Sequence, residues 1–365
     1  MKVLYIMPPA PTVPGFNPVE QYVLELATAV TGRGVESYIM VPAERVEAMS
    51  TIRGLRVLTW TDGDFPLAIK KTLREVRPHV VQIENEPQLV RSVRQSYEGQ
   101  LILNLHSLHY LAGGTIPRSE LRVALCLVDK IVLRSHFLKS LFLGRYYGLR
   151  LRASVIHPGV DLIKFSPYQG NRTLEKERLM MRRGWGVERE LVALFATRPD
   201  PEKGLNTIVK AWLDLAKDIP IRLVVAGPVP AALVQSLQGD MRLLGNRIIH
   251  VDAIEHASMP SLYRAADLVV CPSQGREALG ITSIEALASG IPVIASYRGA
   301  ITEVVTDECG YLVRQYTQPS AWAKIIRKVT SDENSLRFLG VNGRKRSLQF
   351  GWERAVTQFM QAYGG

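Results

Sequence analysis

The chain has 365 residues, of which 22% are charged and 47% hydrophobic, as in ordinary soluble globular proteins. This length exceeds one typical core and fits two domains. The formal net charge is +11, but Lys and Arg exceed Asp and Glu in both halves (20 against 14 up to residue 165, and 25 against 20 beyond it). An evenly spread excess argues against a nucleic-acid-binding tail and leaves an anionic small substrate or an anionic membrane surface as partners.

Short runs of Val, Ile and Leu alternate with amphipathic segments along most of the chain. In the first half we expect strands at 3–7, 36–41, 56–60, 80–84, 101–106, 130–135 and 154–157, and helices at 18–31, 67–76 and 136–146. In the second half we expect strands at 191–197, 222–227, 248–251, 268–272 and 292–296, and helices at 205–217, 260–266, 282–289 and 320–330. A further amphipathic helix is expected at 352–360. The alternation predicts an α/β protein with parallel sheets covered on both faces.

Two features bear on domain organisation and on the membrane. The alternation stops between residues 159 and 190, so we place an interdomain linker at the start of this stretch. The most apolar region, 121–143, is interrupted by charged residues that include Asp129, Lys130, Arg134 and Lys139, and no segment is long and apolar enough to cross a bilayer.

The three cysteines, Cys126, Cys271 and Cys309, show neither paired nor metal-ligand spacing. Each has apolar neighbours, so we expect small core residues. Unpaired cysteines favour a reducing compartment.

The most informative stretch is 272–295, where a predicted strand ends, a loop carries Glu277 and Gly280, and a helix follows. Open α/β sheets bind ligands at such strand ends, and the free amides of a helix start favour phosphate. Glu277 could hydrogen-bond sugar hydroxyls, and Glu285, which lies among apolar neighbours, could bind a ribose diol. The simpler alternative is that Glu277 caps the helix while Glu285 faces solvent or pairs with an Arg.

A second candidate region lies between the strand predicted at 191–197 and the helix opened by Gly204. It contains Arg198 and Lys203, which could bind a diphosphate together with helix amides. Two solvated surface cations are the alternative.

Several stretches together resemble glycosyltransferase family 4. The main one is 277–295, where Glu277 and Glu285 are separated by seven residues and the second is followed by Ala-Leu-Ala-Ser-Gly-Ile-Pro. Further matching stretches are 129–135, 154–167, 196–204 and 352–354, with His157 where the family usually has Asn. The resemblance spans nearly the whole chain.

The resemblance implies a GT-B fold, with two Rossmann-like parallel-sheet domains facing each other across a cleft. Residues 1–165 would form the acceptor-side domain, joined by a C-terminal helix (349–365) that crosses back, and 166–348 would form the nucleotide-sugar domain. The implied function is retaining, metal-independent transfer of a hexose-type sugar from a nucleoside diphosphate sugar to an acceptor, in cell-envelope, polysaccharide or glycoconjugate synthesis. A UDP-sugar is favoured over GDP- or ADP-sugars, without a further cofactor. The implied location is the cytoplasm, peripheral to the inner face of the membrane.

The same resemblance implies site residues. The expected catalytic residues are His106, Arg198, Lys203 and Glu277, with His106 at the end of its strand near the transferred sugar. The expected donor-binding residues are Gly15, Arg198, Lys203, Val251, Glu277, Leu279, Gly280, Ile281 and Glu285. A structural histidine is the alternative for His106, and it is favoured for the nearby His109.

Departures from the family pattern keep other functions open. The family's glycine pair before the first helix is replaced by Asn17 and Pro18, although Glu20 is retained. Asp62 and Asp64 could suggest a metal site, but a turn is the favoured interpretation and we expect no metal. The alternatives are a non-catalytic nucleotide-sugar-binding protein and a GT-B enzyme without a glycosyl acceptor, such as an epimerase or phosphorylase.

Overall fold

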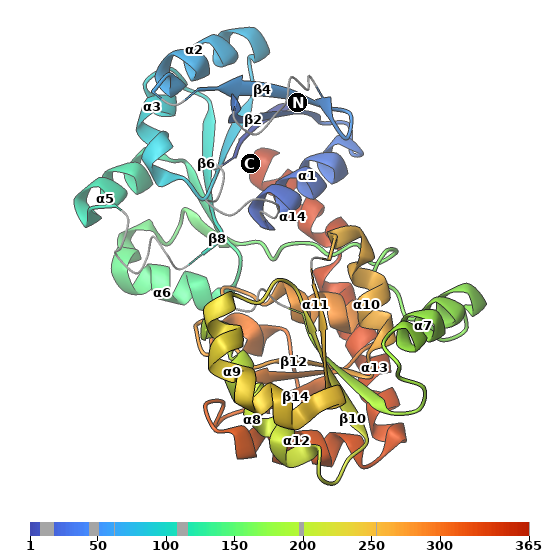
Figure 1. The fold of residues 1–365 in the computed structure, drawn as a ribbon. Helices are drawn as coiled ribbons and strands as arrows, with labels where there is room; N and C mark the ends of the chain where they lie inside the picture. Colours follow the sequence, from blue (N-terminus) through green and yellow to red (C-terminus); the bar gives the residue numbers. More distant parts are fainter. Residues whose placement is uncertain are drawn as a thin grey trace. The chain divides into compact units, whose positions relative to one another are not determined.

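The computed structural model describes residues 1–7, 18–43, 51–61, 63–107, 116–196, 201–252 and 254–364. The chain forms two compact units (Figure 1). The first contains Met1–Gly159 and Trp352–Gly365, and the second contains Val160–Gly351. Each unit is built on its own mainly parallel sheet, which confirms the expected α/β architecture with two Rossmann-like halves.

The sheet of the first unit has eight strands in the order β3-β4-β2-β1-β5-β6-β7-β8. Only the pairing of β3 with β4 is antiparallel. The strands are β1 (Lys2–Ile6), β2 (Glu36–Pro42), β3 (Thr51–Ile52), β4 (Leu55–Trp60), β5 (Val80–Glu84), β6 (Gln100–Leu105), β7 (Lys130–Leu133) and β8 (Ala153–Val155). The order reverses between β1 and β5, which places ligand-binding loops at the carboxyl ends of these strands.

Helices cover both faces of this sheet. One face packs against α1 (Pro18–Thr31) and α14 (Trp352–Gly364). The other packs against α2 (Phe65–Val76), α3 (Val90–Arg94), α5 (Arg118–Leu127) and α6 (His136–Tyr146). Both faces of the sheet are therefore covered, which explains why the side chains of its central strands are nearly all buried and mostly apolar.

The C-terminal helix α14 belongs to the first unit, as expected. Its apolar stripe contributes Val356 and Phe359 to the core on the side of α1. Where the chain leaves the first unit, Gly159 packs so closely on Trp352 that a Cβ would overlap the indole ring. The next residue, Val160, donates its backbone N–H to Phe350 O at 2.8 Å. The chain therefore enters and leaves the second unit at adjacent points.

The observed boundaries differ from the expected ones at 165/166 and 348/349. Phe165 is 2% exposed and Phe350 is 4% exposed, and both lie in the core of the second unit. The short segments 160–165 and 349–351 therefore belong to that unit.

The second unit has a six-stranded sheet with the order β11-β10-β9-β12-β13-β14, and all its pairings are parallel. Counted within this unit the order is 3-2-1-4-5-6, and it reverses between β9 and β12. The strands are β9 (Leu191–Phe195), β10 (Ile221–Ala226), β11 (Ile248–Val251), β12 (Leu268–Cys271), β13 (Val293–Ser296) and β14 (Gly310–Val313).

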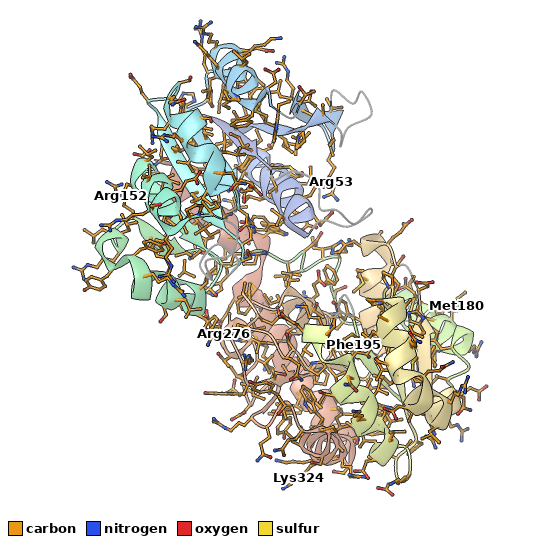
Figure 2. The ribbon with its side chains drawn as sticks, turned by 60° about the vertical axis from the view of Figure 1, so that its left-hand side comes forward. Arg53, Arg152, Met180, Phe195, Arg276 and Lys324 are labelled. Carbon is orange, nitrogen blue, oxygen red and sulfur yellow. The ribbon has the colours of Figure 1, made fainter. Side chains whose placement is uncertain are left out.

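Seven helices among the described residues surround this sheet: α7 (Arg172–Gly184), α8 (Leu205–Leu215), α9 (Ala231–Leu244), α10 (Met259–Ala265), α11 (Ile281–Ala288), α12 (Pro319–Thr330) and α13 (Glu333–Ser347). Phe195 of β9 is fully buried, whereas Met180 of α7 is 71% exposed (Figure 2). The shorter 3-10 segments include η4 (Pro201–Lys203), η6 (His256–Ser258), η7 (Ala300–Glu303) and η8 (Leu348–Phe350).

Some elements are absent from the sequence prediction. These are α3, α5, α7, α9, α13, β3 and β14. In α7, Arg182 is the one side chain classed as buried, so this helix lacks the apolar stripe on which a prediction depends. Its start is instead fixed by Asn171, whose side chain accepts hydrogen bonds from Thr173 N and Leu174 N.

One cysteine expectation is wrong. Cys126 is exposed because it lies on the outer side of α5, while Cys271 and Cys309 are buried as expected. Burial raises the pKa of Cys271 to about 11. Within the described ranges, the structure contains no helix with the length and apolarity that a bilayer crossing requires.

We expect Phe359→Ala to destabilise the first unit by about 3–5 kcal/mol, because a fully buried ring would be replaced by a cavity. The measurement is hydrogen exchange of the β1 amides, which reports the free energy of opening. Gln361→Ala changes an exposed position of the same helix and serves as the control, with an expected effect of about 0.5 kcal/mol or less. Equal losses in both variants would contradict the docking of α14 on this sheet.

Candidate functional site

The candidate site of the second unit lies where the strand order reverses. Strands β9 and β12 are parallel neighbours, so the loops that follow them emerge side by side. Glu202 O accepts hydrogen bonds from Gln274 N at 2.6 Å and from Gly275 N at 3.2 Å. These two bonds tie the β9 loop to the β12 loop.

Gly204 allows the two loops to approach so closely. Its φ is +76°, and a Cβ at this position would overlap the carbonyl oxygen of Pro272. Both the left-handed backbone and the lack of space require glycine. The adjacent Lys203 is thereby held against the β12 loop.

Lys203 and Glu277 form an ion pair in this position. The distance from Lys203 Nζ to Glu277 Oε1 is 2.6 Å, and Ser273 Oγ donates to the same oxygen at 2.9 Å. The two charged side chains are 25% and 22% exposed, so solvent and ligands can reach them. The structure therefore places a cation and a carboxylate together at the carboxyl edge of the sheet.

Glu277 does not cap the following helix. The N-cap of α11 is Gly280, which has φ +84° and provides no side-chain cap. The loop is instead fixed through the backbone, where Ala300 N donates to Glu277 O at 3.0 Å. The capping alternative for Glu277 is therefore wrong.

Two other expected donor-binding residues flank Gly280. Leu279 is 3% exposed and packs in the core of the second unit, so it anchors the loop to that core. Ile281 is the first residue of α11 and is partly buried. Main-chain N–H groups at this helix start suit an anionic ligand.

Glu285 lies deeper, with 7% of its surface exposed. Tyr263 OH donates to its Oε2 at 2.8 Å, and His256 Nε2 lies 3.3 Å from its Oε1. Lys164 Nζ lies 3.3 Å from His256 Nδ1. Because an ammonium only donates, His256 Nδ1 accepts and its Nε2–H faces Glu285. Burial and then the neighbouring carboxylate raise the pKa of Tyr263 well above its ordinary value.

Glu285 is therefore not solvent-facing, so that alternative is wrong. Among the residues that the structure describes, it is held by Tyr263 and His256 rather than by an Arg. The contacts with Tyr263 and His256 leave further lone pairs on a carboxylate that has about four acceptor positions. Val251, expected near a nucleobase, ends β11, which is separated from β9 by β10.

The candidate site of the first unit contains His106. The strand ends at Leu105, one residue earlier than predicted, and His106 follows it. Its Nε2 lies 2.5 Å from Glu84 Oε2, and its backbone N–H donates to Asn85 Oδ1 at 3.0 Å. Only 4% of its surface is exposed, so His106 lies in the interior of this unit.

Burial lowers the pKa of His106 below its ordinary value. The Arg134 guanidinium lowers it further, and the contact with Glu84 only partly offsets these two effects. The imidazole is therefore neutral near pH 7.

Several expected residues lie outside the described part of the chain. These are Gly15, Asn17, Asp62, His109 and Arg198. Asp64 is described, and it precedes α2 in a turn with Gly63 at φ +83°.

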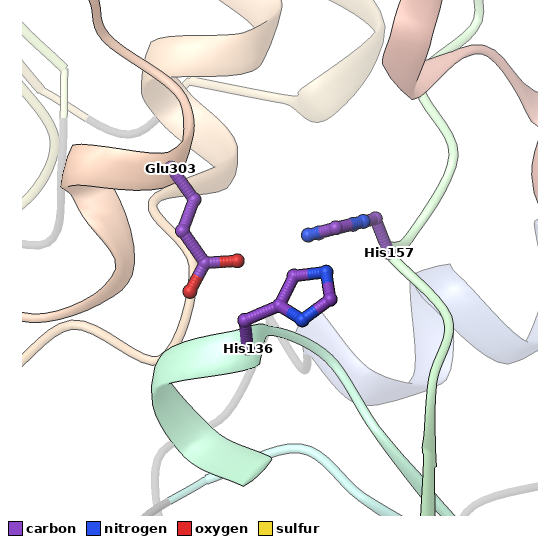
Figure 3. A group of neighbouring side chains, drawn as sticks. All are labelled: His136, His157 and Glu303. Atoms are coloured by element: carbon purple, nitrogen blue, oxygen red, sulfur yellow. The ribbon is translucent and has the colours of Figure 1, made fainter. Parts of the chain in front are cut away.

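His157, which stands where the family usually has Asn, lies beside another histidine of the first unit. Its ring centroid is 5.7 Å from that of His136 (Figure 3). Glu303, also drawn there, belongs to the second unit.

The partners of the expected residues were not predicted from the sequence. These are Ser273 beside Glu277, Tyr263 and His256 beside Glu285, and Glu84 beside His106. The signal for Glu84 was present. Polar residues occupy alternate positions 82 and 84 of one buried strand and 104 and 106 along the next, and in parallel strands such positions share one face.

Comparisons with known proteins identify a glycosyltransferase family for each half of the chain. The sequence model of the family described as "Glycosyltransferase Family 4" matches residues 19–164. The model described as "Glycosyl transferases group 1" matches residues 180–346. The first match lies almost entirely in the first unit and the second lies within the second unit, and together they cover most of the chain.

Similar curated proteins cover nearly the full length. Spore coat protein SA of Bacillus subtilis is 23% identical over 97% of this chain and 96% of its own length. D-inositol 3-phosphate glycosyltransferase of Xylanimonas cellulosilytica is 27% identical over 94% of this chain and 90% of its own length.

Solved structures share the whole fold. Anabaena HepE, crystallised with UDP and glucose, superposes with a TM-score of 0.81 at 20% identity, over 99% of both chains. Sucrose-phosphate synthase from Thermosynechococcus elongatus gives a TM-score of 0.80 at 22% identity, over 100% of this chain and 98% of that protein.

We expect Tyr263→Phe to lower the free energy of unfolding by about 1.5–3 kcal/mol, because Glu285 would lose a buried hydrogen bond to a charged acceptor. Equilibrium unfolding in urea measures this loss. Tyr297→Phe removes a hydroxyl from a residue that is 44% exposed, and its effect should stay within about 0.5 kcal/mol. Equal losses in the free energy of unfolding for the two variants would show that Tyr263 does not stabilise the Glu285 carboxylate.

Proposed function

We propose that this chain, which belongs to the family 4 glycosyltransferases with the GT-B fold, transfers a hexose-type sugar from a nucleoside diphosphate sugar to an acceptor hydroxyl with retention of configuration. The observation that carries the proposal is the Lys203–Glu277 pair at the strand-order reversal of the second unit. A cation beside a carboxylate suits a ligand with a diphosphate and a hydroxylated sugar. The solved structures of Anabaena HepE in complex with UDP and with UDP-glucose support a UDP-sugar as donor.

Lys203 would meet the diphosphate. As the bond between sugar and phosphate breaks, negative charge grows on the leaving nucleotide, and a fixed cation stabilises this charge more than the ground state. The N–H groups at the start of α11 would contribute in the same way, as would Arg198. We propose that these groups act without a metal.

The two glutamates would have different tasks. Glu277 is reachable by solvent and is held by Lys203 and Ser273, so it would face the sugar hydroxyls. Glu285 is anchored by Tyr263 and His256, and it would use its remaining lone pairs for the ribose diol.

The sugar would be transferred by front-face attack assisted by the leaving phosphate. The transition state has oxocarbenium character, as at other glycosidic centres. In this scheme no enzyme carboxylate acts as the nucleophile. Exclusion of water would protect the activated sugar from hydrolysis.

One alternative has a specific observation in its favour. The full-length relative named spore coat protein SA carries the name of a coat component, which fits a binding or assembly role without turnover. The ion pair at the proposed diphosphate site favours the transferase, because charge-assisted contacts placed there serve the reacting bond.

The test of the function has a binding arm and a product arm. We expect the unfolding temperature to rise most with UDP and UDP-sugars among the UDP, GDP and ADP series, since a ligand at 100 times its Kd adds about 2.7 kcal/mol. NMR of the products should then show a glycoside, or slowly released free sugar, with the anomeric configuration of the donor. Inversion would contradict retention.

The same assay carried out in EDTA tests the metal proposal, and we expect unchanged rates. Loss of activity with EDTA and rescue by Mn²⁺ or Mg²⁺ would overturn it. Donor binding without transfer or hydrolysis would instead favour the non-catalytic alternative.

A further prediction distinguishes the proposed roles of the two glutamates. Glu285→Gln should weaken binding of UDP and UDP-sugar alike, because the ribose occurs in both. Glu277→Gln should spare UDP and lower kcat/KM for the UDP-sugar, because the sugar is its proposed partner. Calorimetry with both ligands and steady-state kinetics measure these effects. Equal loss of UDP binding in the two variants would refute this division.

A further inference from the structure

A chain of buried polar side chains lies under the carboxyl ends of β5 and β6. These strands pair in parallel with Glu84 opposite Asn104. Glu84 Oε1 accepts from Gln82 Nε2 at 2.5 Å, and Oε2 accepts from Asn104 Nδ2 at 3.0 Å. Oε2 also lies 2.5 Å from His106 Nε2. All four side chains are buried within the first unit.

Tyr363 OH, on α14, donates to Gln82 Oε1 at 2.8 Å, and the amide nitrogen of Gln82 faces Glu84. A flipped Asn104 would turn its oxygen towards a carboxylate oxygen, which is unfavourable. Both Glu84 oxygens therefore accept from amides, as an ionised carboxylate does. His106 Nε2 must then carry the hydrogen that faces Glu84.

The other imidazole nitrogen, His106 Nδ1, is buried and has no hydrogen-bond partner among the residues that the structure describes. Buried polar atoms in native proteins are nearly always paired, so such an atom needs an explanation. His106 directly follows the carboxyl end of β6, the edge at which open α/β sheets bind ligands. At this edge, an unpaired acceptor could be satisfied by a donor group of a ligand.

Neighbouring groups hold the ring neutral and in place. Tyr22 packs edge-on against His106 with a centroid distance of 4.9 Å. The guanidinium of Arg134 lies 5.0 Å from the Tyr22 ring centroid and supplies positive charge near Glu84. This cation balances the carboxylate and disfavours a second positive charge on His106.

We propose that Glu84 is a positioning residue for sugar transfer, which fixes His106 as the Nε2–H tautomer so that Nδ1 accepts a hydrogen bond from a hydroxyl group of the sugar substrate. The inference rests on the proposed function for the identity of the ligand. The tautomer and its dependence on Glu84 are properties of the free protein.

The first test is made without substrate. In the full-length protein labelled with ¹⁵N-histidine, we expect His106 at pH 7.5 to show a protonated Nε2 and an unprotonated Nδ1. Its signals are assigned by their loss in His106→Asn. A protonated Nδ1 in the wild-type protein would overturn the proposal. This measurement on the wild type needs no change at Glu84 that could impair folding.

The second test is a double-mutant cycle on kcat/KM. In Glu84→Gln, an amide replaces a group whose two oxygens both accept, and the charge is lost. We expect a loss of about 10–100-fold, typical of residues that orient a functional side chain. His106→Asn keeps an acceptor near the position of Nδ1 but does not reach Glu84. In that background, Glu84→Gln should change kcat/KM by about twofold or less. A full loss in both backgrounds would show that Glu84 does not act through His106.

Two controls complete the design. Glu75→Gln removes an exposed carboxylate of the same unit, which pairs with Arg56, and should leave kcat/KM within about twofold. UDP binding should be unchanged in Glu84→Gln, because its proposed site lies in the second unit. Loss of UDP binding would indicate that Glu84→Gln misfolds. The tautomer measurement on the wild-type protein would then decide whether the proposal holds.

The experiments distinguish failure of the proposed transferase function from failure of the proposed positioning of His106 by Glu84. The expected tautomer without any transferase activity would leave the positioning by Glu84 intact and remove the sugar as its ligand. If the enzyme transfers sugar with retention but His106 shows the opposite tautomer, the positioning by Glu84 alone is refuted. The same holds if the losses in kcat/KM caused by Glu84→Gln and His106→Asn are additive.

Discussion

Two hydrogen bonds to one carbonyl oxygen, Glu202 O, join the loops that follow β9 and β12. Parallel pairing brings these loops to the same edge, and Gly204 lets them touch because no Cβ intervenes. Once the loops are joined, the ion pair of Lys203 with Glu277 needs little further ordering. The joined loops already hold the two side chains close together before a ligand binds. The loss of side-chain entropy that weakens exposed ion pairs is therefore small for this pair.

Each unit contains a pair of a glutamate and a histidine, and the pair has a different role in each. In each, a mostly buried carboxylate contacts the Nε2 atom of a histidine: Glu84 with His106, and Glu285 with His256. In the second unit, Lys164 already occupies the other histidine nitrogen, so His256 serves to hold Glu285. In the first unit that nitrogen has no protein partner within the described ranges. The same pair of residue types thus orients a carboxylate in one unit and a histidine in the other.

Periodicity predicted the elements whose apolar residues meet a core. The helices Pro18–Thr31 and His136–Tyr146 match their predicted bounds, and each buries apolar side chains such as Leu26 and Phe142. The helix α7 was missed because it buries little and starts at an Asn cap. At the site, the motif identified Glu277 and Glu285, but their partners Ser273, Tyr263 and His256 come from loops and helices that only tertiary folding brings near. Charge and spacing along one segment contain no information about such contacts.

The placement of α14 has a consequence for the order of events during synthesis. The core that receives Phe359, and the polar side chains that end at Tyr363, include strands that are translated before the second unit. Between them lies the whole second unit, Val160–Gly351, which a ribosome needs about 10–40 s to produce. During that interval one face of the first sheet lacks its final helix, and the hydrogen bond from Tyr363 to Gln82 cannot form. The first unit to be translated is thus the last to be completed, and its nascent form exposes apolar surface that a chaperone could recognise.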